Sequence, residues 1–251
     1  MKEKISRFFS GIQAVFDGTL LFWQTPRLWG LALIPFILLL IAYALMIWGG
    51  IESTAMVTEK LRHVAETWPQ YLQWLIVPLS FMLHILGALG VILIFIFCSG
   101  TLYETLGGMF FDRIVEKLFA EEKGEFAICR NSWLFEVKGI VDALLYTLGT
   151  LAIALGALVL YLLPMAGAFL WMILISYRLG VFYMALGALR FGRSFADSRT
   201  LARKNMLAVT GYGLAVYTIC LIPLVPLVML PGIIIGGVLL QKSIIGHQKR
   251  S

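Results

Sequence analysis

The stretch Met206–Gln241 decides the fold: it reads MLAVTGYGLAVYTICLI over 206–222, PLVP over 223–226 and LVMLPGIIIGGVLLQ over 227–241. At about 1.5 Å per residue the first apolar run reaches only about 25 Å, less than the roughly 30 Å hydrocarbon core of a bilayer. Arg203 and Lys204 precede the stretch and Lys242 follows it, so both ends are expected on the cytoplasmic face. The pattern therefore predicts a Pro-broken hairpin that enters the membrane and returns.

A break at membrane depth also constrains what surrounds it. Free backbone N–H and C=O groups find no partner in lipid, so they are tolerated only inside protein or beside a water-filled cavity. We therefore expect the protein to enclose something other than lipid.

The composition places the chain among integral membrane proteins, because 60% of its 251 residues are hydrophobic and only 14% are charged. Cys98, Cys129 and Cys220 lie far apart, which argues against a disulfide framework and a metal site. The net charge of +6 suits the inner leaflet of a membrane and would also suit an anionic ligand. We expect contacts with anionic lipid headgroups and no nucleic-acid partner.

The first half of the chain predicts one surface helix and two crossings. Residues 1–24 carry apolar side chains at helical spacing beside a polar face, which favours an amphipathic helix in the interface plane. Residues 29–51 and 71–103 contain no charge and are long enough to cross the bilayer. The loop between them, 52–70, is expected outside, with a short interfacial helix.

The second half begins with the largest polar region, 104–142, for which an amphipathic cytoplasmic helix fits best. The apolar block 143–189 follows, and it is interrupted by Pro164 and by Arg178. Basic residues flank this block, so both of its ends are expected inside, whether its arms span the bilayer or form a deep hairpin. A basic element at 190–205 then leads into the hairpin 206–241.

The distribution of Lys and Arg supports this topology. Lys60 and Arg62 are the only ones expected outside, Arg178 lies in the membrane, and the remaining 17 of 20 are expected inside. The sequence therefore predicts one all-α integral membrane domain, 1–251, with two transmembrane helices, two Pro-broken hairpins entering from the cytoplasmic side and amphipathic interfacial helices. Both termini of this multi-pass protein are expected in the cytoplasm.

No catalytic constellation is visible in the sequence. His63, His84 and His247 are too scattered for a metal site or a catalytic triad, and no glycine-rich phosphate loop occurs. The sequence therefore predicts neither an enzyme nor a cofactor.

The best candidate for a ligand site is the turn Thr25–Gly30, that is Thr25, Pro26, Arg27, Leu28, Trp29 and Gly30. Thr25 suits an N-cap and Pro26 suits the first helical position. Free N–H groups at a helix start and the guanidinium of Arg27 would together bind an oxyanion. The alternative is a capped helix with one arginine that only sets the topology.

Arg178 is a second candidate, because a charge near mid-membrane costs roughly 3 kcal/mol on insertion scales. Such a residue usually faces a partner or a water-filled path, although a shallow helix would let it reach the interface. His84, near the centre of its span, favours a hydrogen bond between helices over a proton relay. A further basic cluster, which favours anionic lipid over a ligand vestibule, comprises Arg199, Arg203, Lys204 and Asn205.

Several motifs together resemble one known family. They are Leu189–Phe195, Arg199, Leu201, Arg203–Asn205, Gly211–Gly213, Ile222–Pro223 and Pro231–Gly232, with Phe110, Asp112, Glu116 and Lys117 upstream and the spacing of Pro26 and Pro35. The chain resembles the CysZ-type sulfate permeases and the wider superfamily of etoposide-induced membrane proteins over nearly its whole length. The resemblance implies two transmembrane helices, two half-penetrating hairpins, a homo-oligomer and sulfate entry for cysteine synthesis.

The chain departs from that family at one motif. The sulfate-contacting Gly-Leu-Arg-Arg of the family corresponds to Arg27–Gly30 of this chain, and both arginines of the motif are replaced here. Arg27 and the helix-start amides remain at that position. The sequence as a whole predicts a bacterial inner-membrane permease or channel for a small oxyanion, sulfate first. The rival hypothesis is a non-transporting membrane scaffold or a lipid-binding envelope protein.

Overall fold

A computed structural model describes residues 2–67, 69, 72–122, 126–129, 133–162, 166–222 and 224–248. Over these residues the chain forms helices and short connections, and no strand is found among them. The prediction of an all-α membrane protein is therefore confirmed. Five of the helical segments are long and apolar enough to cross a membrane: Pro26–Ala65, Gln73–Leu93, Val137–Gly156, Ala166–Phe191 and Val225–His247.

The chain begins with α1 (Lys2–Trp23), a 3-10 turn η1 (Pro26–Leu28), α2 (Trp29–Ala65), a second turn η2 (Gln73–Leu75) and α3 (Ile76–Leu118). After a connecting segment come α4 (Trp133–Gly156), η4 (Ala157–Leu162), α5 (Ala166–Ala188) and η5 (Leu189–Phe191). The chain then forms α6 (Phe195–Lys204), α7 (Met206–Cys220) and α8 (Val225–Gln248).

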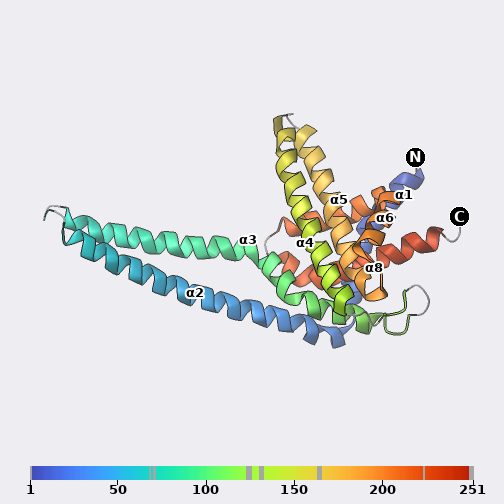
Figure 1. Cartoon of the computed structure of the whole chain (residues 1–251), viewed down its shortest axis with the longest axis horizontal. Coiled ribbons are helices and arrows are strands. Elements are labelled where there is room, and N and C mark those ends of the chain that lie inside the picture. The colour runs from blue at the N-terminus through green and yellow to red at the C-terminus, as the bar shows by residue number, and fades with distance from the viewer. Residues whose placement is uncertain are drawn as a thin grey trace.

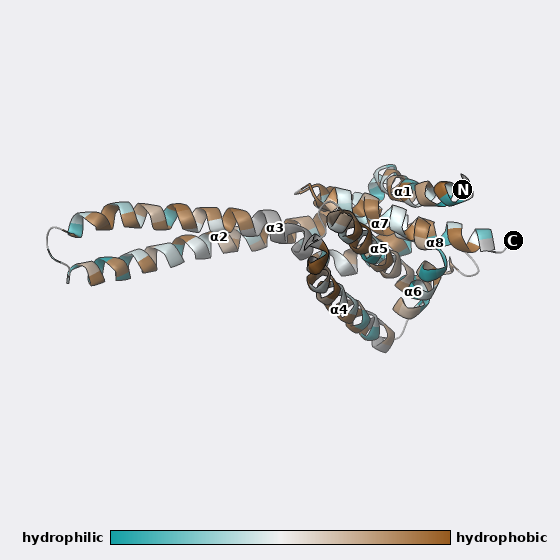
Figure 2. Ribbon diagram, turned by 90° about the horizontal axis from the view of Figure 1, so that it is seen from above, coloured by the Kyte–Doolittle hydropathy of each residue, from teal (hydrophilic) through white to brown (hydrophobic). Residues whose placement is uncertain are grey.

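The helices α2 and α3 pair into a long arm that reaches away from the rest of the molecule (Figure 1). Large apolar side chains such as Leu45, Trp48 and Phe81 are exposed along it, as a lipid-facing surface requires. Figure 2 shows hydrophilic residues concentrated near the far tip of the arm.

The arm differs from the sequence-based expectation in its length. Residues 52–65, expected in an outside loop with a short helix, continue α2 without interruption. Charged residues there do not end the helix because Glu, Lys and Arg are good helix formers and no Pro or Gly follows Ile51 before Ala65. At the other end, α3 runs on to Leu118 and absorbs the start of the region expected as a separate cytoplasmic helix over 104–142.

Each of the two regions expected as a Pro-broken hairpin contains two helices, and their path through the membrane stays a prediction. The first consists of α4 and α5, joined through η4, with Pro164 outside the described residues. The second consists of α7 and α8; α7 ends at Cys220, α8 begins at Val225, and Leu224 between them has a φ of 70°. Pro226 lies in the first turn of α8, where a missing N–H is tolerated, and α8 continues past Gln241 to Gln248.

The helices α1, α5, α7 and α8 form the compact body beside the arm, and glycines let their backbones meet. A Cβ added at Gly11 of α1 would lie 1.9 Å from the carbonyl oxygen of Ala208 in α7. One added at Gly236 of α8 would lie 2.5 Å from the carbonyl oxygen of Ala14 in α1. Only glycine permits such close approach.

The packing of α1 divides its apolar residues between two surfaces. Ala14, Val15 and Phe22 are buried against the body, whereas Phe9 and Phe16 are exposed. The helix therefore contributes to the protein core as well as presenting an apolar surface.

Polar contacts join the end of α3 to the second half of the chain. Arg190 in η5 donates to Asp112 of α3 at 2.6 Å, and Lys242 of α8 pairs with Glu122. The guanidinium of Arg193 lies 5.2 Å from the ring centre of Phe126. These contacts set where α5 and α6 sit relative to the arm.

Candidate functional site

Arg178 on α5 is held against α4 by three contacts. Its Nε donates to Thr150 Oγ1 at 2.9 Å, and its Nη2 donates to the backbone carbonyl of Tyr146 at 2.9 Å. The guanidinium also lies 4.0 Å from the ring centre of Tyr146, within the range of a cation–π interaction. The side chain is thus fixed in a half-buried position, with its charge beside polar and aromatic groups of the neighbouring helix α4.

Two further arginines come from α6, which is short, amphipathic and well capped. Its N-cap Ser194 accepts a hydrogen bond from the backbone N–H of Asp197 (3.2 Å), and the Asp197 carboxylate accepts from the Ser194 N–H at 2.9 Å. The Ser194 hydroxyl also donates to the Asp197 carboxylate at 2.6 Å. This hydrogen bond first, and then that from the Ser194 N–H, lowers the pKa of Asp197. Phe195 and Ala202 form part of the buried face of α6.

Phe195 packs α6 against both α4 and α5, with its ring centre 5.2 Å from that of Tyr146 and 6.2 Å from that of Phe182. Arg199 and Arg203 lie one turn apart and border the same hollow as Arg178. We call this hollow the arginine groove; its volume is about 590 Å³. It is lined by Asp142, Leu145, Tyr146, Gly149 and Ile153 of α4, by Arg178 of α5, and by Phe195, Ala196, Arg199, Thr200 and Arg203 of α6.

The charges of the arginine groove are unbalanced. Three guanidinium groups face one carboxylate, that of Asp142. Among the described residues, no salt bridge within 4.0 Å joins Asp142 to Arg178, Arg199 or Arg203. The groove therefore offers several N–H donors and an excess of positive charge, which is the chemistry that recognises an oxyanion.

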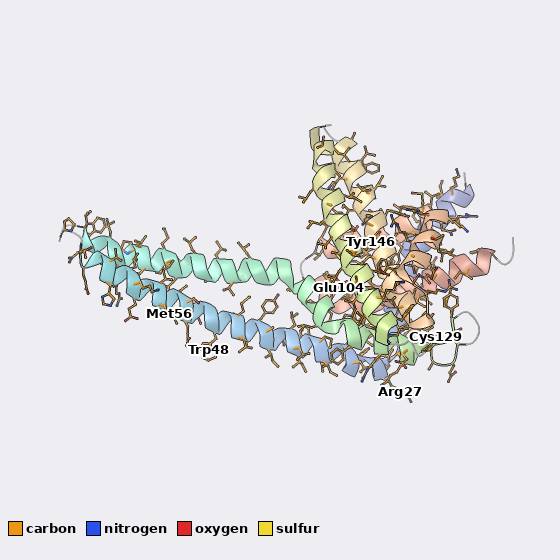
Figure 3. The ribbon with its side chains drawn as sticks, viewed as in Figure 1. Arg27, Trp48, Met56, Glu104, Cys129 and Tyr146 are labelled. Carbon is orange, nitrogen blue, oxygen red and sulfur yellow. The ribbon has the colours of Figure 1, made fainter. Side chains whose placement is uncertain are left out.

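The turn at Thr25–Gly30 lies elsewhere in the molecule. Figure 3 shows Arg27 well separated from Tyr146, which borders the arginine groove. The Thr25 hydroxyl does not cap the following helix, because it donates to the carbonyl oxygen of Leu21 at 2.9 Å. Pro26 occupies the first position of η1, as expected, and Arg27 is exposed.

The other residues of this turn differ in their exposure. Leu28 is buried, and Trp29 packs edge-on against Trp23, with ring centres 5.2 Å apart. No atom lies within 4 Å of a Cβ built on Gly30 in the described structure. The turn therefore remains a separate candidate site that Arg178 does not join.

The remaining predicted residues also lie outside the arginine groove. His84 is exposed on α3, and its Nδ1 lies 2.7 Å from the carbonyl oxygen of Ser80 in the same helix. Lys204 is exposed, and Asn205 donates from Nδ2 to the carbonyl oxygen of Leu201 at 3.1 Å. Of the predicted basic cluster, Arg199 and Arg203 therefore line the groove, whereas Lys204 and Asn205 end α6.

The sequence analysis missed the contribution of α4 to the groove. Asp142, Tyr146 and Gly149 are spaced at i, i+4 and i+7, so they share one face of a helix. That spacing could have been noticed in the sequence. It was obscured because Asp142 had been placed at the end of the polar region and not in the helix that follows.

Comparisons with known proteins identify the family of the chain and no individual curated relative. A search of curated proteins finds no match. The family model described as "Sulfate transporter CysZ/Etoposide-induced protein 2.4" matches residues 14–231. The match runs from α1 into the first turns of α8, so it includes α4–α7, the whole arginine groove and the turn at Arg27. The chain therefore belongs to the sulfate transporter CysZ/etoposide-induced protein 2.4 family.

Proposed function

We propose that the protein is an inner-membrane permease or channel for a small oxyanion. The reference substrate is sulfate, because the family description names a sulfate transporter. The observation that carries the proposal is the convergence of Arg178, Arg199 and Arg203 on one groove. Guanidinium groups match the oxygens of tetrahedral oxyanions with two parallel N–H donors. A groove that brings three of them together from two helices is suited to bind such an ion.

Arg178 is the arginine of the groove whose side chain is held by the described hydrogen bonds. A guanidinium has five N–H donors, and the described contacts with Thr150 and Tyr146 use two of them. The others remain available to a ligand from a side chain whose orientation is already fixed. Because the side chain is held before the ligand arrives, binding loses less conformational entropy.

Arg199 and Arg203 have a different part in the proposal. Both are exposed, so they can attract anions from solution before Arg178 is reached. Their exposure also keeps binding weak, and passage requires an ion to leave as readily as it enters. We infer that the ion moves between α6 and the α4–α5 hairpin.

Other parts of the proposal follow from charge distribution and family membership. Both termini lie in the cytoplasm, because lysines and arginines are concentrated in the segments that would then face it. Lys204 and its basic neighbours contact anionic lipid headgroups. The protein is bacterial, acts as a homo-oligomer and supplies sulfate for cysteine synthesis.

Uptake of radiolabelled sulfate into proteoliposomes tests the proposal. We expect uptake above that of empty liposomes, and a reduced rate for the double variant Arg199→Ala/Arg203→Ala. Arg27→Ala measures whether the second candidate turn contributes. Arg62→Ala, which removes an exposed charge from the arm, is the matched control and should retain the wild-type rate.

The absence of uptake by protein that is shown to be folded would contradict the proposal. It would favour the rival function, a scaffold or a lipid-binding envelope protein. In that case the arginine groove would have to be explained by contacts with lipid headgroups.

A further inference from the structure

Asp142 places a carboxylate in the wall of the otherwise basic arginine groove. It lies on α4, one turn before Tyr146, and its half-buried side chain borders the same hollow as the three arginines. A carboxylate beside arginines normally forms an ion pair with one of them. Among the described residues, Asp142 has neither a hydrogen bond nor a salt bridge to any of the three.

The donors and the acceptor of the groove therefore lie on different walls. Arg178, Arg199 and Arg203 present N–H donors from α5 and α6, whereas Asp142 presents a charged acceptor from α4. A ligand that fills the space between them meets both kinds of group. The best ligand would accept hydrogen bonds on one side and donate one on the other.

Tetrahedral oxyanions differ in this respect. Sulfate carries no proton at neutral pH, so all of its oxygens are acceptors and none can donate to a carboxylate. Inorganic phosphate at the same pH keeps at least one O–H group, which can donate to Asp142 while its other oxygens accept from the arginines. Both anions meet the negative charge of Asp142, but sulfate would leave the carboxylate acceptor unpaired, which disfavours its binding relative to phosphate.

We propose that the arginine groove selects tetrahedral oxyanions that carry a proton, so that it binds hydrogen phosphate more tightly than sulfate, and that Asp142 sets this preference. The inference rests on the proposed function, since it takes the groove as the oxyanion site. Sulfate still binds through the arginines, but without a partner for Asp142.

Calorimetric titration of the purified full-length protein in detergent tests this preference. The probes are inorganic phosphate, sulfate and dimethyl phosphate, at one ionic strength and neutral pH. Because a good hydrogen bond to a charged group changes affinity about tenfold, phosphate should bind wild type about ten times more tightly than sulfate. Dimethyl phosphate is a tetrahedral diester and, like the phosphate of a lipid, has no O–H group. It should therefore bind more weakly than inorganic phosphate, as sulfate does.

The variant Asp142→Asn separates the carboxylate from the rest of the groove. It removes the negative charge and supplies an amide that can donate, so sulfate should bind about tenfold more tightly and the preference for phosphate should vanish. Glu59→Gln, which neutralises an exposed carboxylate on α2, should leave both affinities unchanged. Folding of each variant is checked by circular dichroism.

The outcomes distinguish this inference from the proposed function. Sulfate binding as tight as phosphate in wild type, or an unchanged ratio in Asp142→Asn, would overturn the role of Asp142 while leaving an oxyanion groove. A preference for dimethyl phosphate over inorganic phosphate would also overturn it, and would indicate a lipid phosphodiester as the ligand. Failure of all three anions to bind folded wild type would refute the oxyanion groove, and the inference with it.

Discussion

Arg178 shows how one residue is retained in an otherwise apolar helix. A guanidinium in the middle of a membrane helix costs roughly 3 kcal/mol on insertion scales. Two hydrogen bonds to α4 and the ring of Tyr146 offset this cost. The same contacts hold the guanidinium at the wall of the arginine groove, in the position that the proposed oxyanion site requires.

Thr150 is therefore expected to act as a positioning residue. Thr150→Val keeps the volume of the side chain but removes the oxygen that accepts from Arg178 Nε, so we expect oxyanion affinity to fall roughly tenfold. Thr150→Ser keeps the hydroxyl and should retain most of the affinity. The positioning role of Thr150 is contradicted if Thr150→Val binds as wild type does, or if Thr150→Ser loses as much affinity as Thr150→Val.

The sequence could indicate that Arg178 needs a polar partner but could not identify it. The partners lie 28 and 32 positions away, at Thr150 and Tyr146, and which α4 residues face Arg178 depends on the connection between the two helices. A shift of one residue there would turn a different face of α4 toward α5. Asp142 remained unassigned for the same reason.

Among the elements, α6 depends on its capping box. The pKa of Asp197 is lowered in the folded protein, so its ionised form stabilises the fold above the pKa of an unfolded aspartate, about 3.9, and this contribution is lost as pH falls through the lower folded value. We expect Asp197→Asn to be less stable than wild type at pH 7, with the difference shrinking below about pH 4. Thermal unfolding in detergent at several pH values measures this difference.

Ser194→Ala provides the matching test of the cap itself. It should destabilise α6 by about 1 kcal/mol, as other lost N-caps do. A stability difference between Asp197→Asn and wild type that persists unchanged at acid pH would contradict the claim that the ionised carboxylate of Asp197 stabilises the capping box.

The contact between α1 and α8 depends on glycine. A Cβ at Gly236 would lie 2.5 Å from a backbone oxygen of α1, so Gly236→Ala should separate the helices and cost about 1–3 kcal/mol. Gly246→Ala on the same helix meets open space among the described residues and should be neutral or stabilising by about 0.5–1 kcal/mol. Equal unfolding temperatures for the two variants would show that the close approach of α1 and α8 contributes nothing.

Most helices could be predicted from the sequence because apolar runs, prolines and caps mark them locally. The spacing of Gly232 and Gly236 is typical of a close helix contact, but it does not identify α1 as the partner. The end of α2 could not be placed in the same way. Its last turns are polar, and polar residues at helical spacing continue a helix as well as they form a loop.

For the whole molecule, the orientation in the membrane remains the main prediction. With both termini in the cytoplasm, only the tip of the α2–α3 arm should face outside. Single cysteines in a protein lacking Cys98, Cys129 and Cys220 can be labelled with an impermeant reagent from either side. A cysteine at Glu59 should react from outside, whereas one at Lys117 or Arg199 should react only after the membrane is opened.

The depth of the two hairpins is tested with the same reagent. If they enter and return, cysteines at Pro164 and Pro226 should resist labelling from outside. The lengths of α4, α5 and α8 would allow them to cross. Labelling of either position as readily as the tip of the arm would therefore mean complete crossings and would contradict the half-penetrating hairpin.

The flux of sulfate through Arg178→Ala in proteoliposomes tests the central claim most directly. The variant should insert and fold normally, because the lost side chain lines the groove, but its flux should fall about tenfold or more. Arg178→Lys should keep part of the flux, since the charge remains while the planar fork is lost. Flux through Arg178→Ala equal to that of wild type would place Arg178 outside the path and would contradict the assignment of the arginine groove.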